Sequence, residues 1–233
     1  LIRMGVETII TFDAHDNRVQ NAIPNNGFDN FFTSYQFIST ILNDMPDLIV
    51  DNEHLMTISP DEGGMRRAVF YSNQLGVDMG MFFKRRNYST LVNGEHPVIS
   101  MEFLGNDVSG KDVIIVDDMI ASGKTVLEVA KELKKRNAAR VIICATFGLF
   151  NDGLEELDQA YKEKVFDHIY TTNLCYCPSA LKERPYYHNV DLSRYIALII
   201  DTLNHDTSVN DIMNATKRIQ ELLEERSKNI SSK

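Results

Sequence analysis

The stretch Val113-Ile114-Ile115-Val116-Asp117-Asp118-Met119-Ile120-Ala121-Ser122-Gly123-Lys124-Thr125 decides the fold of this chain. Its apolar first half is typical of a buried strand, and two adjacent carboxylates follow directly. A loop with small residues, a glycine and two hydroxyls comes next, and a helix is predicted to begin at about Val126. Because N–H groups at a helix start lack partners and lie at the positive end of the helix dipole, those of residues 122–125 are expected to bind an anion. The pattern predicts a sugar-phosphate site, in which Asp117 and Asp118 accept hydrogen bonds from ribose hydroxyls or hold Mg²⁺.

Two alternatives compete for this stretch. Gly123-Lys124-Thr125 resembles the end of a P-loop, but that motif needs a glycine five positions before its Gly-Lys pair, and Asp118 stands there. The P-loop is therefore excluded. An ordinary strand-to-helix turn with an aspartate cap and no ligand stays open. Crevices at strand ends of α/β sheets usually bind ligands, which favours the sugar-phosphate site.

The composition fits a soluble protein with one large domain, or a domain with an appendage. Among 233 residues, 33 are Asp or Glu and 24 are Lys or Arg, and the net charge of −9 argues against a nucleic-acid-binding surface. The three cysteines show no spacing typical of a disulfide framework or a zinc site, which favours the reducing cytosol. No apolar stretch approaches a membrane span, and no signal peptide is visible. We expect a cytoplasmic protein that binds neither membrane nor nucleic acid.

Strand-like apolar runs alternate with helical patterns along the chain. The runs are residues 8–12, 55–59, 79–83, 98–103, 112–116, 141–147 and 168–172, and the helical patterns are residues 31–42, 64–75, 125–137, 153–162 and 193–204. This alternation predicts an α/β fold with a mainly parallel sheet flanked by helices, and ligands at the carboxyl ends of the strands. The chain begins Leu1-Ile2-Arg3-Met4-Gly5 without an initiator Met, and residues 6–12 already have the pattern of a buried strand, so the chain is expected to start inside a domain.

The last residues have a different character. An apolar stripe at helical spacing predicts a helix docked on its own domain or on a partner. Its members are Ile212, Ala215, Ile219, Leu222 and Leu223. We expect one domain over residues 1–206 and a C-terminal helical tail over residues 207–233.

Three more polar motifs follow predicted strands. They are Asp13-Ala14-His15-Asp16, the turn Ser59-Pro60-Asp61-Glu62-Gly63-Gly64, and Lys84-Arg85-Arg86 before a polar loop. A carboxylate is a good ligand for Mg²⁺, glycines allow a ligand to approach the backbone, and cations stabilise a transferring phosphoryl group. Each motif also has a plain structural explanation, namely a structural histidine, a capped helix start and a solvated basic turn.

Together and in this order, the motifs resemble the C-terminal half of the ribose-phosphate diphosphokinases, which make phosphoribosyl diphosphate (PRPP). The resemblance covers roughly residues 1–206. It includes Asp13-Ala14-His15 with Gln20, Phe28-Asp29-Asn30, residues 59–64, Lys84-Arg85-Arg86, Gly110-Lys111-Asp112-Val113, residues 117–125 and Thr171-Thr172-Asn173. Type I phosphoribosyltransferases share only the loop of residues 117–125 strongly. The resemblance implies a phosphoribosyltransferase-like fold.

The resemblance also implies a role for each motif. His15 and Asp61 match Mg²⁺-associated positions, and Lys84 and Arg86 match a catalytic lysine and the arginine beside it. Asp117 and Asp118 match the acidic pair that binds the ribose hydroxyls. The loop that binds the 5-phosphate is matched by Ala121, Ser122, Gly123, Lys124 and Thr125. The implied reaction moves the β,γ-diphosphoryl group of ATP onto the C1 hydroxyl of ribose 5-phosphate, giving PRPP and AMP. The implied protein is a cytoplasmic homo-oligomer, either a dimer or a hexamer, that uses Mg²⁺.

The sequence departs from this family at several points. Ala121 stands where the diphosphokinases usually have Asp, Lys124 replaces a small residue, and the family's N-terminal half, with much of the ATP site, has no counterpart here. Two alternatives therefore stay open. One is a phosphoribosyltransferase that consumes PRPP and requires neither Lys84 nor His15. The other is a non-catalytic regulatory subunit, against which the retained motifs argue.

Overall fold

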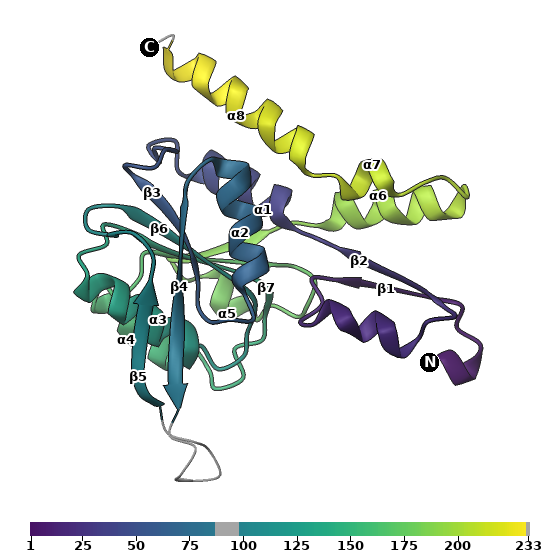
Figure 1. Ribbon diagram of the computed structural model, residues 1–233, viewed down its shortest axis with the longest axis horizontal. Coiled ribbons are helices and arrows are strands. Elements are labelled where there is room, and N and C mark those ends of the chain that lie inside the picture. The colour runs from purple at the N-terminus through teal and green to yellow at the C-terminus, as the bar shows by residue number, and fades with distance from the viewer. Residues whose placement is uncertain (87–97, 232–233) are drawn as a thin grey trace.

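The computed structural model describes residues 1–86 and 98–231 (Figure 1). Within these residues the main sheet has seven strands in the order β5-β4-β3-β6-β7-β8-β9. Strand β5 is antiparallel to β4, and all other neighbours are parallel. The strands are β3 (Leu55–Ser59), β4 (Asp78–Arg86), β5 (Val98–Leu104), β6 (Asp112–Ile120), β7 (Val141–Gly148), β8 (His168–Thr172) and β9 (Tyr187–Val190). The predicted α/β fold with a mainly parallel sheet is confirmed.

Helices cover both faces of this sheet. In β6, Val113 and Ile115 belong to a core with α3 and α4, whereas Ile114 and Val116 belong to a second core with α1 and α2. Alternate residues of a strand point to opposite faces, so a central strand buried on both faces is continuously apolar. The helices are α1 (Ser34–Asp44), α2 (Met65–Leu75), α3 (Lys124–Lys135), α4 (Glu155–Lys162), α5 (Ser179–Lys182) and α6 (Ser193–Asn204).

A separate two-stranded parallel sheet precedes α1. It consists of β1 (Thr8–Phe12) and β2 (Gly27–Phe31), and short 3-10 turns lie at Ile2–Met4 (η1) and Asn17–Ala22 (η2). Phe12 and Phe31 pack against each other, with ring centroids 5.8 Å apart, and against Tyr195 of α6, at 6.1 and 6.2 Å. The expectation of a buried strand here was wrong: none of the residues of β1 is buried, and a two-stranded sheet covered on one side leaves Thr8 and Ile10 exposed.

The boundary between β2 and α1 also differs from the prediction. The helix predicted from Phe31 begins only at Ser34, and Phe31 is the last residue of β2. Its side chain is fully buried in the aromatic cluster with Tyr195. The apolar pattern around an aromatic residue such as Phe31 fits the end of a strand and the start of a helix equally well. Tertiary packing placed Phe31 in the strand.

The C-terminal apolar stripe docks on the chain's own domain, as expected. It is divided between α7 (Asn210–Met213) and α8 (Thr216–Ser231), because Asn214 adopts an extended conformation between them. Ile219 is fully buried beside α1 and α2, and Leu222 and Leu223 pack against the same core. Figure 1 shows α8 as the long helix that leads to the C-terminus. None of the helices within residues 1–86 and 98–231 has the length and apolar composition needed to cross a membrane.

Arg226 attaches α8 to the end of α1. Its Nη1 donates to Leu42 O at 2.6 Å, and its Nη2 donates to the carbonyls of Met45, Pro46 and Leu48 at 2.8–3.1 Å. Carbonyls at a helix end have no partner within the helix, so the guanidinium replaces water there.

Replacing Arg226 with alanine is expected to lower the free energy of unfolding by about 2 kcal/mol, because hydrogen bonds from a charged group are lost. Urea unfolding followed by circular dichroism measures this change. Lys217→Ala is the matched control: Lys217 is an exposed cation on the same helix whose contact with Glu221 is 3.8 Å long. That variant should stay within about 0.5 kcal/mol of the wild type. Equal effects of the two substitutions would contradict a specific role for Arg226.

Candidate active site at the strand ends

The two adjacent carboxylates lie within β6, which continues to Ile120 instead of ending at Val116 as expected. Asp118 is buried, Asp117 is half-buried, and Asp118 N–H donates to Asp117 Oδ1 at 2.9 Å. Burial and the neighbouring Asp118 raise the pKa of Asp117 to about 7. Burial opposes ionisation of Asp118 as well, but hydrogen bonds from Asp117 and His15 lower its pKa overall. Near neutral pH the pair therefore combines an ionised carboxylate with one that is readily protonated.

His15 reaches this pair from the other sheet. Its Nδ1 lies 2.7 Å from Asp118 Oδ2, although 103 residues separate them in sequence. The hydrogen bond to Asp118 raises the pKa of His15 above its ordinary 6.5, while 76% of the side chain stays exposed. A histidine in this state is suited to donate a hydrogen bond to an anionic ligand from its exposed edge.

Asp61 lies in the tight turn between β3 and α2. Ser59 Oγ donates to Asp61 O at 2.6 Å, and Gly64 N–H donates to Asp61 Oδ1 at 3.1 Å. A Cβ on Gly64 would lie 2.8 Å from Ser59 Oγ and 3.4 Å from Val116 O, so only glycine lets this turn approach β6 so closely. Asp61 acts electrostatically on both His15 and Asp117, which places a third carboxylate in the same acidic region.

The loop after β6 ends at the start of a helix, as predicted, but α3 begins at Lys124 rather than at about Val126. Gly123 is the N-cap with φ of +90°, and no side chain caps the helix. Ser122 Oγ accepts from Lys124 N–H at 3.3 Å, and Lys124 Nζ pairs with Asp152 at 3.1 Å. Ala121 is exposed, and Thr125 lies in the first turn. A loop with an uncapped helix N-terminus is suited to an anion such as a phosphate ester.

Lys84 and Arg86 lie in the last part of β4. Their backbone pairs with Met101 and Val98 of β5, with a register shift at Arg86. Their side chains, and the polar loop of residues 87–97, lie outside the part of the chain that the structure describes.

His15 and Asp61 are the residues expected to associate with Mg²⁺. Within residues 1–86 and 98–231, no group of three or more His, Cys, Asp or Glu side chains is arranged to hold a metal ion alone. Mg²⁺ usually takes only one or two carboxylates from a protein and completes its shell with water and substrate phosphates. The acidic region formed by Asp61, Asp117 and Asp118 fits an ion held in this way.

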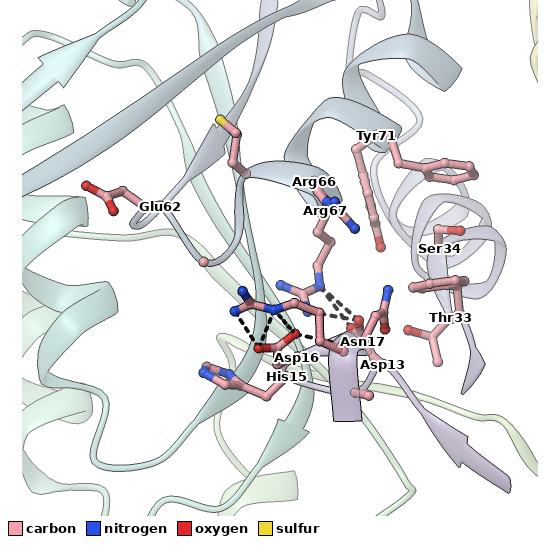
Figure 2. Close-up of a pocket in the computed structure, with 16 residues that line it drawn as sticks. Asp13, His15, Asp16, Asn17, Thr33, Ser34, Glu62, Arg66, Arg67 and Tyr71 are labelled. Carbon is pink, nitrogen blue, oxygen red and sulfur yellow. Dashed lines mark hydrogen bonds and ion pairs between the residues drawn. The ribbon is translucent and has the colours of Figure 1, made fainter. Parts of the chain in front are cut away.

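A pocket of about 600 Å³ opens beside His15, between η2, the start of α1 and α2 (Figure 2). Neither the acidic pair of β6 nor the loop of residues 121–125 lines it. The pocket wall includes Arg67, to which the sequence assigned no role. Arg67 donates from Nε and Nη2 to the carboxylate of Asp13 at 2.8–3.1 Å. The sequence signals for this contact were Asp13 directly after a strand and Arg67 three residues after the Gly-Gly pair, in the first turn of the helix.

Comparisons with known proteins identify the family to which the chain is related. The sequence profile of the phosphoribosyl transferase domain matches residues 35–179. The ribose-phosphate pyrophosphokinase of Vibrio parahaemolyticus is 30% identical over 220 residues, which cover 92% of this chain and 63% of that protein. The enzyme of the same name from Mycoplasma genitalium is 31% identical over 176 residues, covering 74% of this chain and 48% of that protein. The chain thus spans between about half and just under two thirds of these relatives.

A solved structure shares the fold. The crystal structure of phosphoribosylpyrophosphate synthetase from Mycobacterium smegmatis superimposes with a TM-score of 0.72 at 23% identity, covering 88% of this chain and 61% of that one. The matched profile, which covers more than half of the chain, and the sequence relatives lead to one conclusion. The chain belongs to the phosphoribosyl transferase domain family and is a relative of the ribose-phosphate pyrophosphokinases within it.

Proposed function

We propose that the protein is a ribose-phosphate diphosphokinase. In this reaction the C1 oxygen of ribose 5-phosphate attacks the β-phosphorus of ATP. The bond between that phosphorus and the oxygen bridging to the α-phosphate breaks, so that AMP leaves and PRPP forms. The C1 hydroxyl gives up its proton to the medium. The reaction needs little covalent chemistry from the protein. The protein mainly positions the two substrates and stabilises the charge on the transferring phosphoryl group.

The ribose 5-phosphate site is proposed at the end of β6. Asp117 and Asp118 would accept hydrogen bonds from the ribose 2- and 3-hydroxyls. The N–H groups of residues 121–125 and the hydroxyls of Ser122 and Thr125 would hold the 5-phosphate at the start of α3. Gly123 supports this assignment, because it brings no capping side chain to the helix start, where Lys124 N–H donates to Ser122 Oγ.

The diphosphoryl donor is proposed to meet this sugar on the side of His15 and Asp61. Mg²⁺, when bound, would neutralise charge on the donor phosphates. His15 would donate a hydrogen bond to a phosphate oxygen, and Lys84 and Arg86 would stabilise the charge that develops during transfer. A homo-oligomer in the cytoplasm remains part of this proposal.

The contact between His15 and Asp118 carries the proposal. It joins a histidine from the β1–β2 sheet to the carboxylate pair of the main sheet at 2.7 Å. The matched transferase profile begins at residue 35, so His15 lies outside it. The alternative of a transferase that consumes PRPP does not require His15, whereas a diphosphokinase must also bind a polyphosphate donor, to which an exposed histidine beside the acidic pair is suited.

Phosphorus NMR of the full-length gene product with ribose 5-phosphate, Mg²⁺ and ATP tests the proposal. Stoichiometric formation of PRPP and AMP is the expected result. Absence of both, with PRPP consumed when free bases are added, would replace the proposal with a phosphoribosyltransferase. Binding of ribose 5-phosphate without any turnover would indicate a regulatory subunit.

A substitution at Gly123 tests the phosphate loop. Gly123→Ala is expected to weaken ribose 5-phosphate binding about 10-fold or more, because alanine resists φ of +90° and shifts the N–H groups at the start of α3. Gly110→Ala is the matched control, since Gly110 has φ of +76° and open space around its Cα. Both variants should lose about 1 kcal/mol of stability. Isothermal titration calorimetry should find weaker binding in the first variant alone, and equal affinity in both would contradict the assignment.

A further inference from the structure

Asp13, which directly follows β1, is a buried carboxylate that the proposed reaction does not use. Only 5% of the residue is exposed, and its φ of +44° is a left-handed conformation that residues other than glycine seldom adopt. Immediately after this turn, Ala14 N–H donates to Asn30 Oδ1 at 3.0 Å, and His15 follows. A backbone conformation of this kind persists only where its surroundings hold it.

Two side chains from the main-sheet layers hold the Asp13 carboxylate. Arg67, in the first turn of α2, donates to it from Nε and Nη2, and Thr146, in β7, donates from Oγ1 at 2.7 Å. Because Thr146 uses its proton on Asp13, it accepts from Thr33 Oγ1 at 3.0 Å. Both Arg67 and Thr146 therefore donate to the Asp13 carboxylate, and Figure 2 shows Arg67 directed at Asp13.

The charge of Arg67 also acts on the acidic pair of β6. Its side chain is only 15% exposed, and it interacts electrostatically with Asp118 and Asp117 as well as with Asp13. The guanidinium that binds the carboxylate of the β1 turn thus also offsets the negative charge of the proposed ribose site.

The position of His15 depends on such side-chain contacts. Among the described residues, neither β1 nor β2 forms a backbone ladder with the main sheet. The aromatic cluster of Phe12, Phe31 and Tyr195 holds the β1–β2 sheet against α6 by apolar contacts and extends to the residue directly before Asp13. The contacts of Asp13 with Arg67 and Thr146 add polar links to the main-sheet layers at the point where β1 ends.

We infer that Arg67, together with Asp13 and Thr146, is a positioning residue that holds His15 against Asp118 for diphosphoryl transfer. This inference rests on the proposed function. Arg67 touches neither substrate in this scheme and acts through Asp13 and the backbone turn. A displacement of about 1 Å of a group at a reacting centre can lower a rate about 10²-fold, so a small shift of this turn is sufficient to matter.

The test uses the full-length protein with Arg67→Gln and with the milder Thr146→Val, which keeps the side-chain shape. Both are expected to lower kcat, the first about 10²-fold, while the KM for ribose 5-phosphate changes less than about 3-fold. Thr146→Ser restores the hydroxyl and should restore kcat. If Arg67→Gln does not fold, the comparison of valine with serine at residue 146 still decides the question.

A matched control is the ion pair between Arg140 and Asp112, at the other end of β6. It is also bidentate, with distances of 2.9 and 2.6 Å, and it is partly buried. Arg140→Gln should lower the melting temperature without changing kcat. If the loss of kcat in Arg67→Gln or Thr146→Val is fully explained by a smaller fraction of folded protein, the inference is overturned.

A second readout does not depend on turnover. In the wild type, nuclear Overhauser contacts between the His15 ring and the Asp118 methylene are expected, and they should weaken in Arg67→Gln and Thr146→Val but not in Arg140→Gln. Unchanged contacts in the first two variants would overturn the inference even if activity fell. If the wild-type protein has no diphosphokinase activity, the proposed function is wrong. The nuclear Overhauser contacts between His15 and Asp118 would still show whether Arg67 positions His15.

Discussion

Replacing Lys84 with alanine is expected to lower kcat for PRPP formation about 10²–10³-fold and to leave ribose 5-phosphate affinity within about 2-fold. The expected loss is that of one preorganised cationic or hydrogen-bonding group that acts mainly on transition-state charge. The resemblance to the diphosphokinases assigns this role, and Lys84 stands near the end of β4, next to the strand that leads to Asp61.

Steady-state kinetics and titration calorimetry on the full-length product measure the two quantities separately. Lys111→Ala serves as the control, because Lys111 is a cation that binds Asn52 O at the opposite end of the sheet. That variant should keep kcat. Equal losses of kcat and ribose 5-phosphate affinity in Lys84→Ala would place Lys84 in substrate binding instead of transfer.

Replacing Asp117 with asparagine is expected to weaken ribose 5-phosphate binding about 10- to 100-fold. The ionised carboxylate accepts hydrogen bonds from ribose hydroxyls in the proposed site, and such charged hydrogen bonds contribute roughly 1.5–3 kcal/mol. Titration calorimetry at pH 8 measures this loss. Asp107→Asn, an exposed carboxylate in the loop before β6, is the control and should bind normally. Normal binding by Asp117→Asn would remove Asp117 from the site.

The same substitution is expected to have the opposite effect on stability. The folded-state pKa of Asp117, about 7, lies above the ordinary value of 3.8. The folded state therefore binds more protons than the unfolded state between these values, and the ionised side chain is destabilising above pH 7. Asp117→Asn should raise the melting temperature at pH 8, and the gain should shrink at pH 5.5, where Asp117 is protonated in the folded wild type. A gain that is independent of pH would contradict the raised pKa.

The sequence predicted the positions of the central strands of the main sheet well. Residues 113–116 are buried on both faces, which requires the continuous apolar run seen in the sequence. Strands β2 and β9 were missed, because Gly27–Phe31 and Tyr187–Val190 are short and mix polar with aromatic residues. Their pairing depends on neighbours that are distant in sequence, and single-strand patterns carry no information about those neighbours.

Local sequence by itself determined the parts of the candidate site that lie within a single strand-to-helix connection. The acidic pair, the loop of residues 121–125 and the Gly-Gly turn after Asp61 each combine a strand end with a helix start. Residue types at adjacent positions specify such junctions, because the backbone conformation and the free N–H groups arise within a few residues.

Only the tertiary structure decided which of these junctions meet. The contacts of His15 with Asp118, and of Asp13 with Arg67 and Thr146, span 54 to 133 residues. Arg226 likewise reaches carbonyls of Leu42 in α1 and of Pro46 just after it, about 180 residues away. The physical reason is that an ion pair or hydrogen bond forms where two elements are brought together by burial of their apolar faces. The sequence encodes those faces as local patterns, but the choice of which polar groups face each other follows from how the layers pack.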